Sequence, residues 1–285
     1  MTSLFDLHCH STISDGVLAP ADVVERAYKN GVRVLALTDH DEVAGTAEAS
    51  ERASALGVVF IPGVEISVTW ANRTVHIVGL GIDATDATLQ ARLKTLRDSR
   101  DGRAQKMAQR LEEMGVQGAY DGAMAFVSNP ALVSRTHFAR FLVEAGHCKT
   151  MQEVFTRYLG DGCPANVPVR WTSLQEAISW IHEAGGEAVI AHPGRYRFSD
   201  VEFDALFTSF KECGGAAIEV ITGSHTPQQF DEYAEVARYY GFQASVGSDF
   251  HEPGSRRDLG ELPALPSDLT PIWQDWTLPC LESSR

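Results

Sequence analysis

The sequence predicts an α/β protein built on a parallel sheet or barrel. Short apolar runs rich in Val and Ile alternate along the chain with helical patterns. Each clear helical pattern ends in a glycine just before the next apolar run, which is the expected stop before a returning strand. Strands that look buried along their whole length and alternate with helices are typical of parallel sheets.

The apolar runs give seven expected strands, and the patterns between them give five expected helices. The strands are 5–8, 32–37, 58–61, 75–80, 188–191, 217–221 and 244–246. The helices are 20–30, 45–56, 173–184, 203–213 and 227–240, and they are followed by Gly31, Gly57, Gly185, Gly214 and Gly241.

The middle of the chain interrupts this alternation. Residues 85–114 have the pattern of a long polar helix, further helical pieces follow at 136–145 and 151–159, and no strong strand precedes Val189. We therefore expect a host domain of residues 1–99 and 166–285 that carries a helical insertion of residues 100–165. The tail from Leu262 is rich in proline and is expected to wrap around the host.

Composition limits the classes of function. The chain has 285 residues, 44% of them hydrophobic, and no apolar run approaches the ~18 residues of a membrane helix. We expect neither a membrane span nor a signal peptide. The five cysteines are scattered without CxxC spacing, which favours the reducing cytoplasm over a disulfide framework or a cysteine zinc site.

The net charge of −14 argues against a protein that coats long nucleic acid. A small anionic substrate remains compatible with this charge, because bound divalent cations can make one pocket positive. Nothing in the sequence indicates an obligate protein partner.

Two histidines stand one residue apart in LFDLHCHS, at the end of the first apolar run. On a strand, His8 and His10 point to the same face, where they are either solvated or bind a metal ion. Cys9 lies between them, faces the other side, and is expected to be a small core residue.

Similar residues follow most of the other expected strands. Ligands collect at the carboxyl ends of strands in parallel α/β folds, so a recurrence of His, Asp and Glu there predicts a polynuclear metal site. The nine candidates are His8, His10, Asp15, His40, Glu65, His76, His192, Asp249 and His251.

Imidazole and carboxylate ligands without thiolate suit manganese, iron or zinc better than calcium, and histidine is unusual for magnesium. A catalytic metal keeps about three protein ligands and an open position, so nine ligands could serve two or three ions. We expect Mn²⁺ in first place, with Fe²⁺, Zn²⁺ or Mg²⁺ as alternatives. Glu65 is the lone glutamate of the set and could bridge two ions.

The motifs DLHCHSTISDG, LALTDHD, PGVEIS, VHIVGLG, IAHPGRY and GSDFH closely resemble, in order, those of the PHP (polymerase and histidinol phosphatase) family, which is related to the amidohydrolases. The resemblance implies a distorted (β/α)7 barrel whose trinuclear metal site uses the same nine residues. The insertion, with SRTHFARFLVEAGH and FTRYLGDGCPANVPV, resembles that of bacterial phosphatases of 3′,5′-nucleoside bisphosphates, which also trim short RNA from the 5′ end. The insertion would then cover the barrel mouth and help to bind the nucleotide.

Five residues outside the metal set are candidates for substrate contact or catalysis. Ser134 is an expected helix N-cap, and with Arg135 and His137 it could bind phosphate at the helix N-terminus. Arg195, three residues after His192, could contact phosphate or take part in catalysis. His225 could protonate the leaving oxygen or contact the substrate. The alternatives are a capping residue, surface arginines and a solvated loop histidine.

Four further residues have plainer expectations. Asp39 either orients a ligand histidine or caps the following helix. His147 and His182 are expected at the surface. Tyr158 could stack on a base, although packing within the insertion is the favoured role.

The leading functional hypothesis is a metal-dependent hydrolase that removes the 3′-phosphate of 3′,5′-nucleoside bisphosphates, with 5′-end action on short RNA as an addition. A histidinol-phosphate-type or other small phosphoester phosphatase is the alternative. A proofreading or accessory module of a polymerase complex and a non-catalytic metal-binding regulator are further hypotheses, and nine intact ligands argue against the last.

Overall fold

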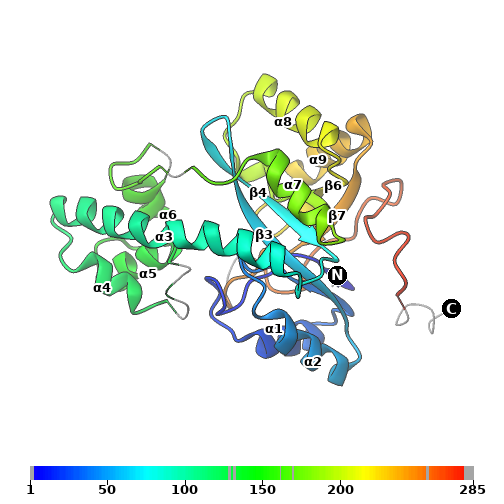
Figure 1. The fold of residues 1–285 in the computed structure, drawn as a ribbon, viewed down its shortest axis with the longest axis horizontal. Coiled ribbons are helices and arrows are strands. Elements are labelled where there is room, and N and C mark those ends of the chain that lie inside the picture. The colour runs from blue at the N-terminus through cyan, green and yellow to red at the C-terminus, as the bar shows by residue number, and fades with distance from the viewer. Residues whose placement is uncertain are drawn as a thin grey trace.

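A nearly closed sheet of seven strands forms the centre of the molecule (Figure 1). The structure is a computed structural model that describes residues 3–127, 130, 133–160, 162–168, 170–254 and 257–278. The strands follow the chain order: β1 (Phe5–Asp6), β2 (Val34–Leu37), β3 (Val59–Trp70), β4 (Arg73–Leu80), β5 (Glu187–Ile190), β6 (Ala217–Thr222) and β7 (Gln243–Gly247). The amide of Leu7 donates to the carbonyl of Val246 at 2.9 Å, which joins β7 to the β1 end of the sheet. The expected distorted seven-stranded barrel is confirmed.

The sheet is mixed, and the expectation of parallel strands is wrong for β4. This strand is antiparallel to both β3 and β5. β3 continues well beyond its expected end at residue 61, to Trp70, and a two-residue turn then reverses the chain. Ala71 and Asn72 form that turn with φ of 45° and 61°, the left-handed geometry that suits a tight hairpin.

Five helices surround the barrel, with α1 (Pro20–Lys29) and α2 (Thr46–Leu56) on one side in Figure 1. The others, α7 (Leu174–Glu183), α8 (Asp200–Glu212) and α9 (Pro227–Tyr240), lie on the opposite side of that view. Capping boxes at Ser173, Ser199 and Thr226 begin α7, α8 and α9 by satisfying backbone amides of the first turn. All five glycines expected to stop helices have positive φ, as a helix end before a returning strand requires.

The helical segment between β4 and β5 projects from the barrel (Figure 1). It contains α3 (Ala87–Glu113), α4 (Ala119–Met124), α5 (Arg135–Glu144), α6 (Met151–Val154) and a π-helical turn (Phe155–Leu159). Its buried side chains, from Ala104 to Val167, form a hydrophobic cluster of their own. The division into a barrel of 1–99 and 166–285 and an insertion of 100–165 stays a proposal, and its first boundary lies inside α3.

The C-terminal segment packs on the barrel as far as it is described. Trp273 stacks on Phe5 with ring centroids 4.1 Å apart, and the indole of Trp276 donates to Glu187 at 3.1 Å. The expectation that this tail wraps the barrel is confirmed up to residue 278. Among the helices of the described residues, none combines the length and apolarity needed to cross a membrane.

Candidate metal centre

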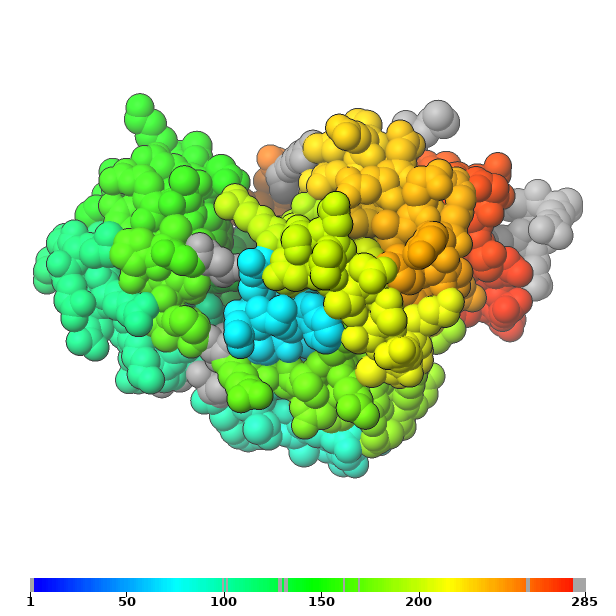
Figure 2. Space-filling model, turned by 90° about the horizontal axis from the view of Figure 1, so that it is seen from above, coloured from blue at the N-terminus to red at the C-terminus, as the bar shows by residue number. Residues whose placement is uncertain are grey.

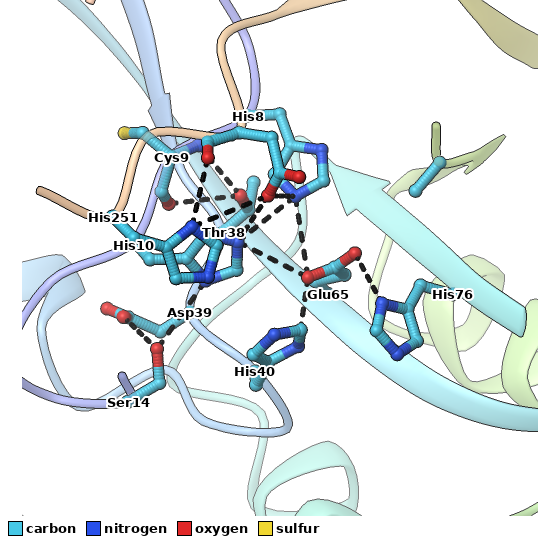
Figure 3. A network of polar contacts seen from close by, with 12 residues as sticks. His8, Cys9, His10, Ser14, Thr38, Asp39, His40, Glu65, His76 and His251 are labelled. Carbon is cyan, nitrogen blue, oxygen red and sulfur yellow. Dashed lines mark hydrogen bonds and ion pairs between the residues drawn. The ribbon is translucent and has the colours of Figure 1, made fainter. Parts of the chain in front are cut away.

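The nine predicted ligands gather at one end of the barrel. Most of them follow the carboxyl end of a parallel strand. Glu65 and His76 differ, because β3 runs on past the other strands and β4 returns beside it, which pairs Ser67 with His76. The two side chains therefore reach the same place from within an antiparallel hairpin. Figure 3 shows Glu65 surrounded by the histidine rings of several strands.

Glu65 lies at the centre of this cluster and is fully buried. Its Oε1 is 2.9 Å from Nδ1 of His76 and 2.9 Å from Nε2 of His192. Its Oε2 is 2.9 Å from Nδ1 of His40, 3.3 Å from Nε2 of His10 and 3.4 Å from Nε2 of His8. One carboxylate thus faces five imidazoles, which is the arrangement of a group that bridges neighbouring metal positions.

Two further carboxylates complete the cluster. Asp249 Oδ1 is 3.3 Å from Nε2 of His10 and 3.5 Å from Nε2 of His8, and these two ring nitrogens are 3.2 Å apart. Asp15 Oδ1 is 3.2 Å from Nε2 of His251. Two ligands on one ion, each at about 2.1 Å, lie about 3.0–3.4 Å apart, so these separations fit common metal positions.

The potential ligand atoms form four overlapping groups, and every predicted ligand belongs to at least one. The groups are His10, Asp15, His40 and His251; His8, His10 and Asp249; His8, Glu65 and His192; and His40, Glu65 and His76.

Each of the three carboxylates leaves one buried oxygen without a hydrogen-bond donor among the described residues. These atoms are Asp15 Oδ1, Glu65 Oε2 and Asp249 Oδ1. A buried carboxylate oxygen without a partner is costly, because its interaction with water has been lost. All three oxygens point at the histidine nitrogens of the groups above, so divalent ions fit the site and would satisfy them.

The electrostatics of the metal-free cluster keep only part of it in the forms that bind metals. Although burial lowers the pKa values of His8, His40 and His251, the neighbouring carboxylates raise them above the usual value, so these imidazoles release protons when a metal binds. Burial alone would raise the pKa of Glu65, yet His40, His76 and His8 hold that pKa well below its usual range. Burial lowers the pKa of His10 and of His192 to about 3, so both imidazoles are neutral at pH 7. A carboxylate and a neutral imidazole are the states in which these side chains donate lone pairs to a metal.

Two of the predicted ligands have strained backbones. His192 and Asp249 have φ of 29° and 54°, in the left-handed region that side chains rarely adopt. The Asp249 amide donates to the carbonyl of His8 at 2.8 Å, and the His192 amide donates to Glu219 Oε2 at 2.5 Å. These bonds hold both residues in conformations that direct their side chains into the cluster.

The predicted phosphate-binding residues line the cluster from two sides. A cavity of about 110 Å³ next to the cluster includes Ser134, Arg135 and Arg195 in its lining. Ser134 is the N-cap of α5, as predicted, and His137 accepts a hydrogen bond from its amide at 3.0 Å in a capping box. His137 is almost fully buried, and burial lowers its pKa to about 4. Arg195 donates to Asp249 Oδ2 at 2.8 Å.

His225 cannot serve as an acid in the arrangement that the structure shows. Its Nε2 accepts from the Gly194 amide at 2.9 Å, and its Nδ1 donates to the Val220 carbonyl at 3.1 Å. Burial lowers its pKa to about 4. Both ring nitrogens are therefore engaged by backbone, and the prediction of proton transfer or substrate contact by His225 is replaced by a role in holding the 194–195 turn.

Comparison with known proteins decides the family. The family profile described as the PHP domain matches residues 6–159, more than half of the chain. The chain belongs to the PHP family. A relative from Chromobacterium violaceum, named 3′,5′-nucleoside bisphosphate phosphatase, is 48% identical over 271 residues, which is 95% of each chain.

A second relative, the 5′-3′ exoribonuclease Rnm of Escherichia coli, is 43% identical over 278 residues, covering 97% of this chain and 94% of that protein. The solved structure of an amidohydrolase from Chromobacterium violaceum, with bound sulfate and no metal, matches with a TM-score of 0.92 at 48% identity over 94% of each chain. The predicted PHP family and its branch are confirmed.

One further acidic residue, absent from the predicted site, supports the metal cluster. Glu219 lies in β6, is almost fully buried, and accepts a hydrogen bond from Nδ1 of His8 at 2.7 Å besides that from the His192 amide. A bulge in β6 follows it directly. A lone glutamate inside the apolar run AIEVIT was the available sign, because an acid is buried in a strand only when it has partners.

Asp39 does not cap the helix that follows, whose N-cap is Gly45, and it reaches a ligand histidine through Ser14, whose hydroxyl lies 3.5 Å from Nδ1 of His10. Its carboxylate accepts from the amide of Ser11 at 2.8 Å, from the hydroxyl of Ser11 at 2.7 Å and from the hydroxyl of Ser14 at 2.6 Å. Asp39 thus fixes the loop that follows His10 and carries Asp15, and in this way it helps to position the metal cluster (Figure 3).

A second missed group ties the helical segment to the metal cluster. Asp41, next to His40, accepts from the amide of Ser67 at 2.8 Å and pairs with Arg100 of α3. Arg100 is almost fully buried, stacks over Trp171 at 4.8 Å and lines the cavity beside the metal cluster. Its long distance in sequence from Asp41 hid this contact from pattern analysis.

The expectations for His147, His182 and Cys9 and the favoured role of Tyr158 are met. His147 and His182 are exposed, and Cys9 is fully buried with its thiol directed at the Ala36 carbonyl. Tyr158 packs against the hydrophobic cluster of the helical segment.

Proposed function

We propose that the chain is a metal-dependent phosphoesterase that converts a 3′,5′-nucleoside bisphosphate to the 5′-nucleotide and phosphate. The observation that carries this proposal is the convergence of nine metal-binding side chains beside a cavity lined by Arg135 and Arg195. The relative named for this activity matches 95% of the chain, which supports the same substrate class. Action on the 5′ end of short RNA belongs to the proposal because two further relatives carry the name exoribonuclease.

The four groups of ligand atoms are the proposed metal positions, and they suffice for two or three ions with Glu65 shared between them. Divalent ions there would supply a hydroxide nucleophile near neutral pH and neutralise charge on the phosphoryl group. We propose Mn²⁺ as the metal, because six imidazoles and three carboxylates without thiolate suit it.

The residues of the chain itself bind and orient the phosphate in this proposal. The Arg195 side chain is half exposed and turned toward the cluster by Asp249, so its outer face is available to a phosphoryl oxygen. Arg135 begins α5, whose N-terminus adds a partial positive charge on the same side of the cavity. A phosphate between these groups would lie beside the predicted ligands that line the same cavity, Asp15, His40, His76 and His251.

The proposed location is the cytoplasm. The four described cysteines are free thiols, and one of them, Cys9, is fully buried in a hydrophobic cluster. Free thiols are typical of a reducing compartment.

The test is phosphate release by Mn²⁺-loaded protein from adenosine 3′,5′-bisphosphate, with 5′-AMP and histidinol phosphate as comparison substrates. We expect release chiefly from the bisphosphate, and Asp249→Asn should lower kcat at least a hundredfold with an unchanged circular dichroism spectrum. Glu232→Gln, which removes an exposed acid on α9, is the matched control. A preference for histidinol phosphate would favour the alternative phosphatase, and full activity of Asp249→Asn would refute the metal assignment.

A further inference from the structure

A larger cavity of about 550 Å³ continues from the one beside the metal cluster. The two share Thr74, Arg135, Phe155 and Arg195 in their linings. The inner cavity, about 110 Å³, lies below the range of about 300–1,000 Å³ that is usual for organic ligands. The inner cavity can hold a phosphate and little more, so a nucleotide attached to that phosphate must lie outside it. The larger cavity, which we call the outer groove, is one space that such a nucleotide can enter.

The outer groove is cationic on an acidic protein. Arg73, Arg135, Arg195 and Arg197 line it, and the described lining residues include no Asp or Glu. Arg73 lies 4.0 Å from Glu202, which is a long ion pair between half-exposed side chains. Because the whole chain carries a net charge of −14, four arginines around one groove form a local site for an extended anion.

A row of aromatic rings leads from the metal cluster into the outer groove. The ring centroids of His192 and Tyr196 are 5.6 Å apart, and those of Tyr196 and Phe198 are 5.9 Å apart. The guanidinium of Arg73 lies over Phe198 at 5.1 Å. The Tyr196 hydroxyl donates to the Ala191 carbonyl and accepts from the His76 amide, both at 2.9 Å, which fixes the start of the row.

The walls of the outer groove come from both parts of the molecule. Arg73 and Thr74 belong to the β3–β4 hairpin, and Gln152 and Phe155 belong to the helical segment. Figure 2 shows the hairpin (cyan) between the helical segment (green) and the rest of the barrel (yellow to orange). The groove is partly open to solvent, so a chain longer than one nucleotide can leave it.

We propose that the outer groove binds the nucleotides that follow the scissile phosphate of a short single-stranded RNA. This inference rests on the proposed function. In the hydrolysis of a 3′,5′-nucleoside bisphosphate and in that of RNA, water adds to phosphorus and the bond from phosphorus to the 3′-oxygen breaks, with a proton passing to that oxygen. In RNA the phosphorus also keeps its bond to the 5′-oxygen of the next nucleotide. The rest of the RNA chain, which begins with that nucleotide, must therefore extend away from the metal cluster, and the groove offers the path. Arginines and aromatic rings are the surfaces that bind single strands without sequence preference.

The experiment compares kcat/KM of the Mn²⁺-loaded protein for adenosine 3′,5′-bisphosphate and for the 5′-phosphorylated trinucleotide pApApA. The variants are Arg197→Ala, which removes an exposed charge, and Phe198→Leu, which removes the aromatic face and keeps an apolar side chain. We expect each to lower the ratio of the trinucleotide value to the bisphosphate value by about tenfold. Arg238→Ala, on α9 and paired with Asp268, is the matched control and should leave the ratio unchanged.

The other outcomes separate this inference from the proposed function. If wild-type protein hydrolyses the bisphosphate and not the trinucleotide, or if both variants keep the wild-type ratio, the outer groove does not bind RNA. An equal loss for both substrates would show that the groove holds the mononucleotide itself, and would also overturn the inference. Failure of wild-type protein to hydrolyse the bisphosphate would instead refute the proposed function.

Salt dependence adds a second readout. For a single strand, log K falls with log salt by about 0.7 per phosphate neutralised. We expect log KM for pApApA to depend more steeply on salt in wild-type protein than in Arg197→Ala. Equal slopes would contradict a phosphate contact by Arg197.

Discussion

Replacement of Glu219 by glutamine tests whether a buried acid behind the metal ligands determines metal affinity. The carboxylate joins the ring of His8, at 2.7 Å, to the backbone of His192, at 2.5 Å. Glutamine has nearly the same shape, but its one carbonyl oxygen can accept from only one of these donors. Its amide group then directs hydrogens at the other donor.

The expected magnitude follows from these two contacts. A hydrogen bond to a charged partner contributes about 1.5–3 kcal/mol, and about 1.36 kcal/mol corresponds to a factor of ten. The loss of one such bond should therefore weaken Mn²⁺ binding about tenfold to 150-fold, which agrees with the effect usual for partners of metal-bound histidines. Although burial lowers the pKa of His8, Glu219 and the neighbouring acids hold it well above its usual value, so the variant imidazole is also a poorer donor.

The assay is a Mn²⁺ titration of metal-free protein followed by calorimetry, with activity measured at each metal concentration. Activity of Glu219→Gln should recover at high Mn²⁺, because the ligands themselves remain. Glu232→Gln should bind Mn²⁺ like wild-type protein. Affinity within twofold of wild type, with an unchanged fold, would refute the inference that Glu219 supports His8.

Three further predictions concern stability. Removal of metal by a chelator should lower the melting temperature in a thermal-shift assay. Mn²⁺ at a hundred times its Kd should restore about 2.7 kcal/mol of the free energy of unfolding, because the unpartnered oxygens of the cluster bind it only in the folded state. An unchanged melting temperature on adding Mn²⁺ would contradict this. Burial raises the pKa of Asp6 to about 6, so folded metal-free protein keeps a proton there that the unfolded chain loses near pH 3.8. The contribution of Asp6 to the free energy of unfolding is therefore greatest below about pH 4 and should fall by about 3 kcal/mol as the pH rises to 7. Carbon NMR of the Asp6 carboxyl in chelator-treated protein measures its pKa. A carboxyl that titrates near pH 4 would refute this prediction. Gly247→Ala should lower the free energy of unfolding in urea by about 1–3 kcal/mol, because the added Cβ would lie 2.2 Å from the His8 Cβ. Gly102→Ala is the control, because its Cβ meets no atom within 4 Å. Equal stability of the two variants would show that the barrel accommodates the contact.

The metal ligands were predictable because their chemistry is local. Residues such as His8 and His10, two apart on a strand, point to the same face. Because similar residues follow successive apolar runs, they were expected at one edge of the sheet. The structure brings all nine together in four overlapping groups. The alternation of strands and helices does not distinguish an open sheet from a barrel. The resemblance to PHP motifs indicated the family and therefore the barrel.

Other features depend on contacts between distant residues. The reversal of β4 depends on the turn at Ala71 and Asn72, where only asparagine was a weak sign of a hairpin. The role of Asp39 depends on Ser11 and Ser14, which approach it only after β1 and β2 pair. His225 was an active-edge histidine by position, and only the path of the backbone at Gly194 and Val220 shows that its nitrogens are occupied.

The sequence by itself determined the class of fold, the helix stops, the helical segment and the ligand set, because each depends on residue type and short-range spacing. Tertiary structure alone decided which acid supports His8 and how the β3–β4 hairpin and the helical segment enclose the outer groove. The physical reason is that these features depend on chain closure over tens to hundreds of residues, as between His8 and Glu219, and no local pattern records such distances.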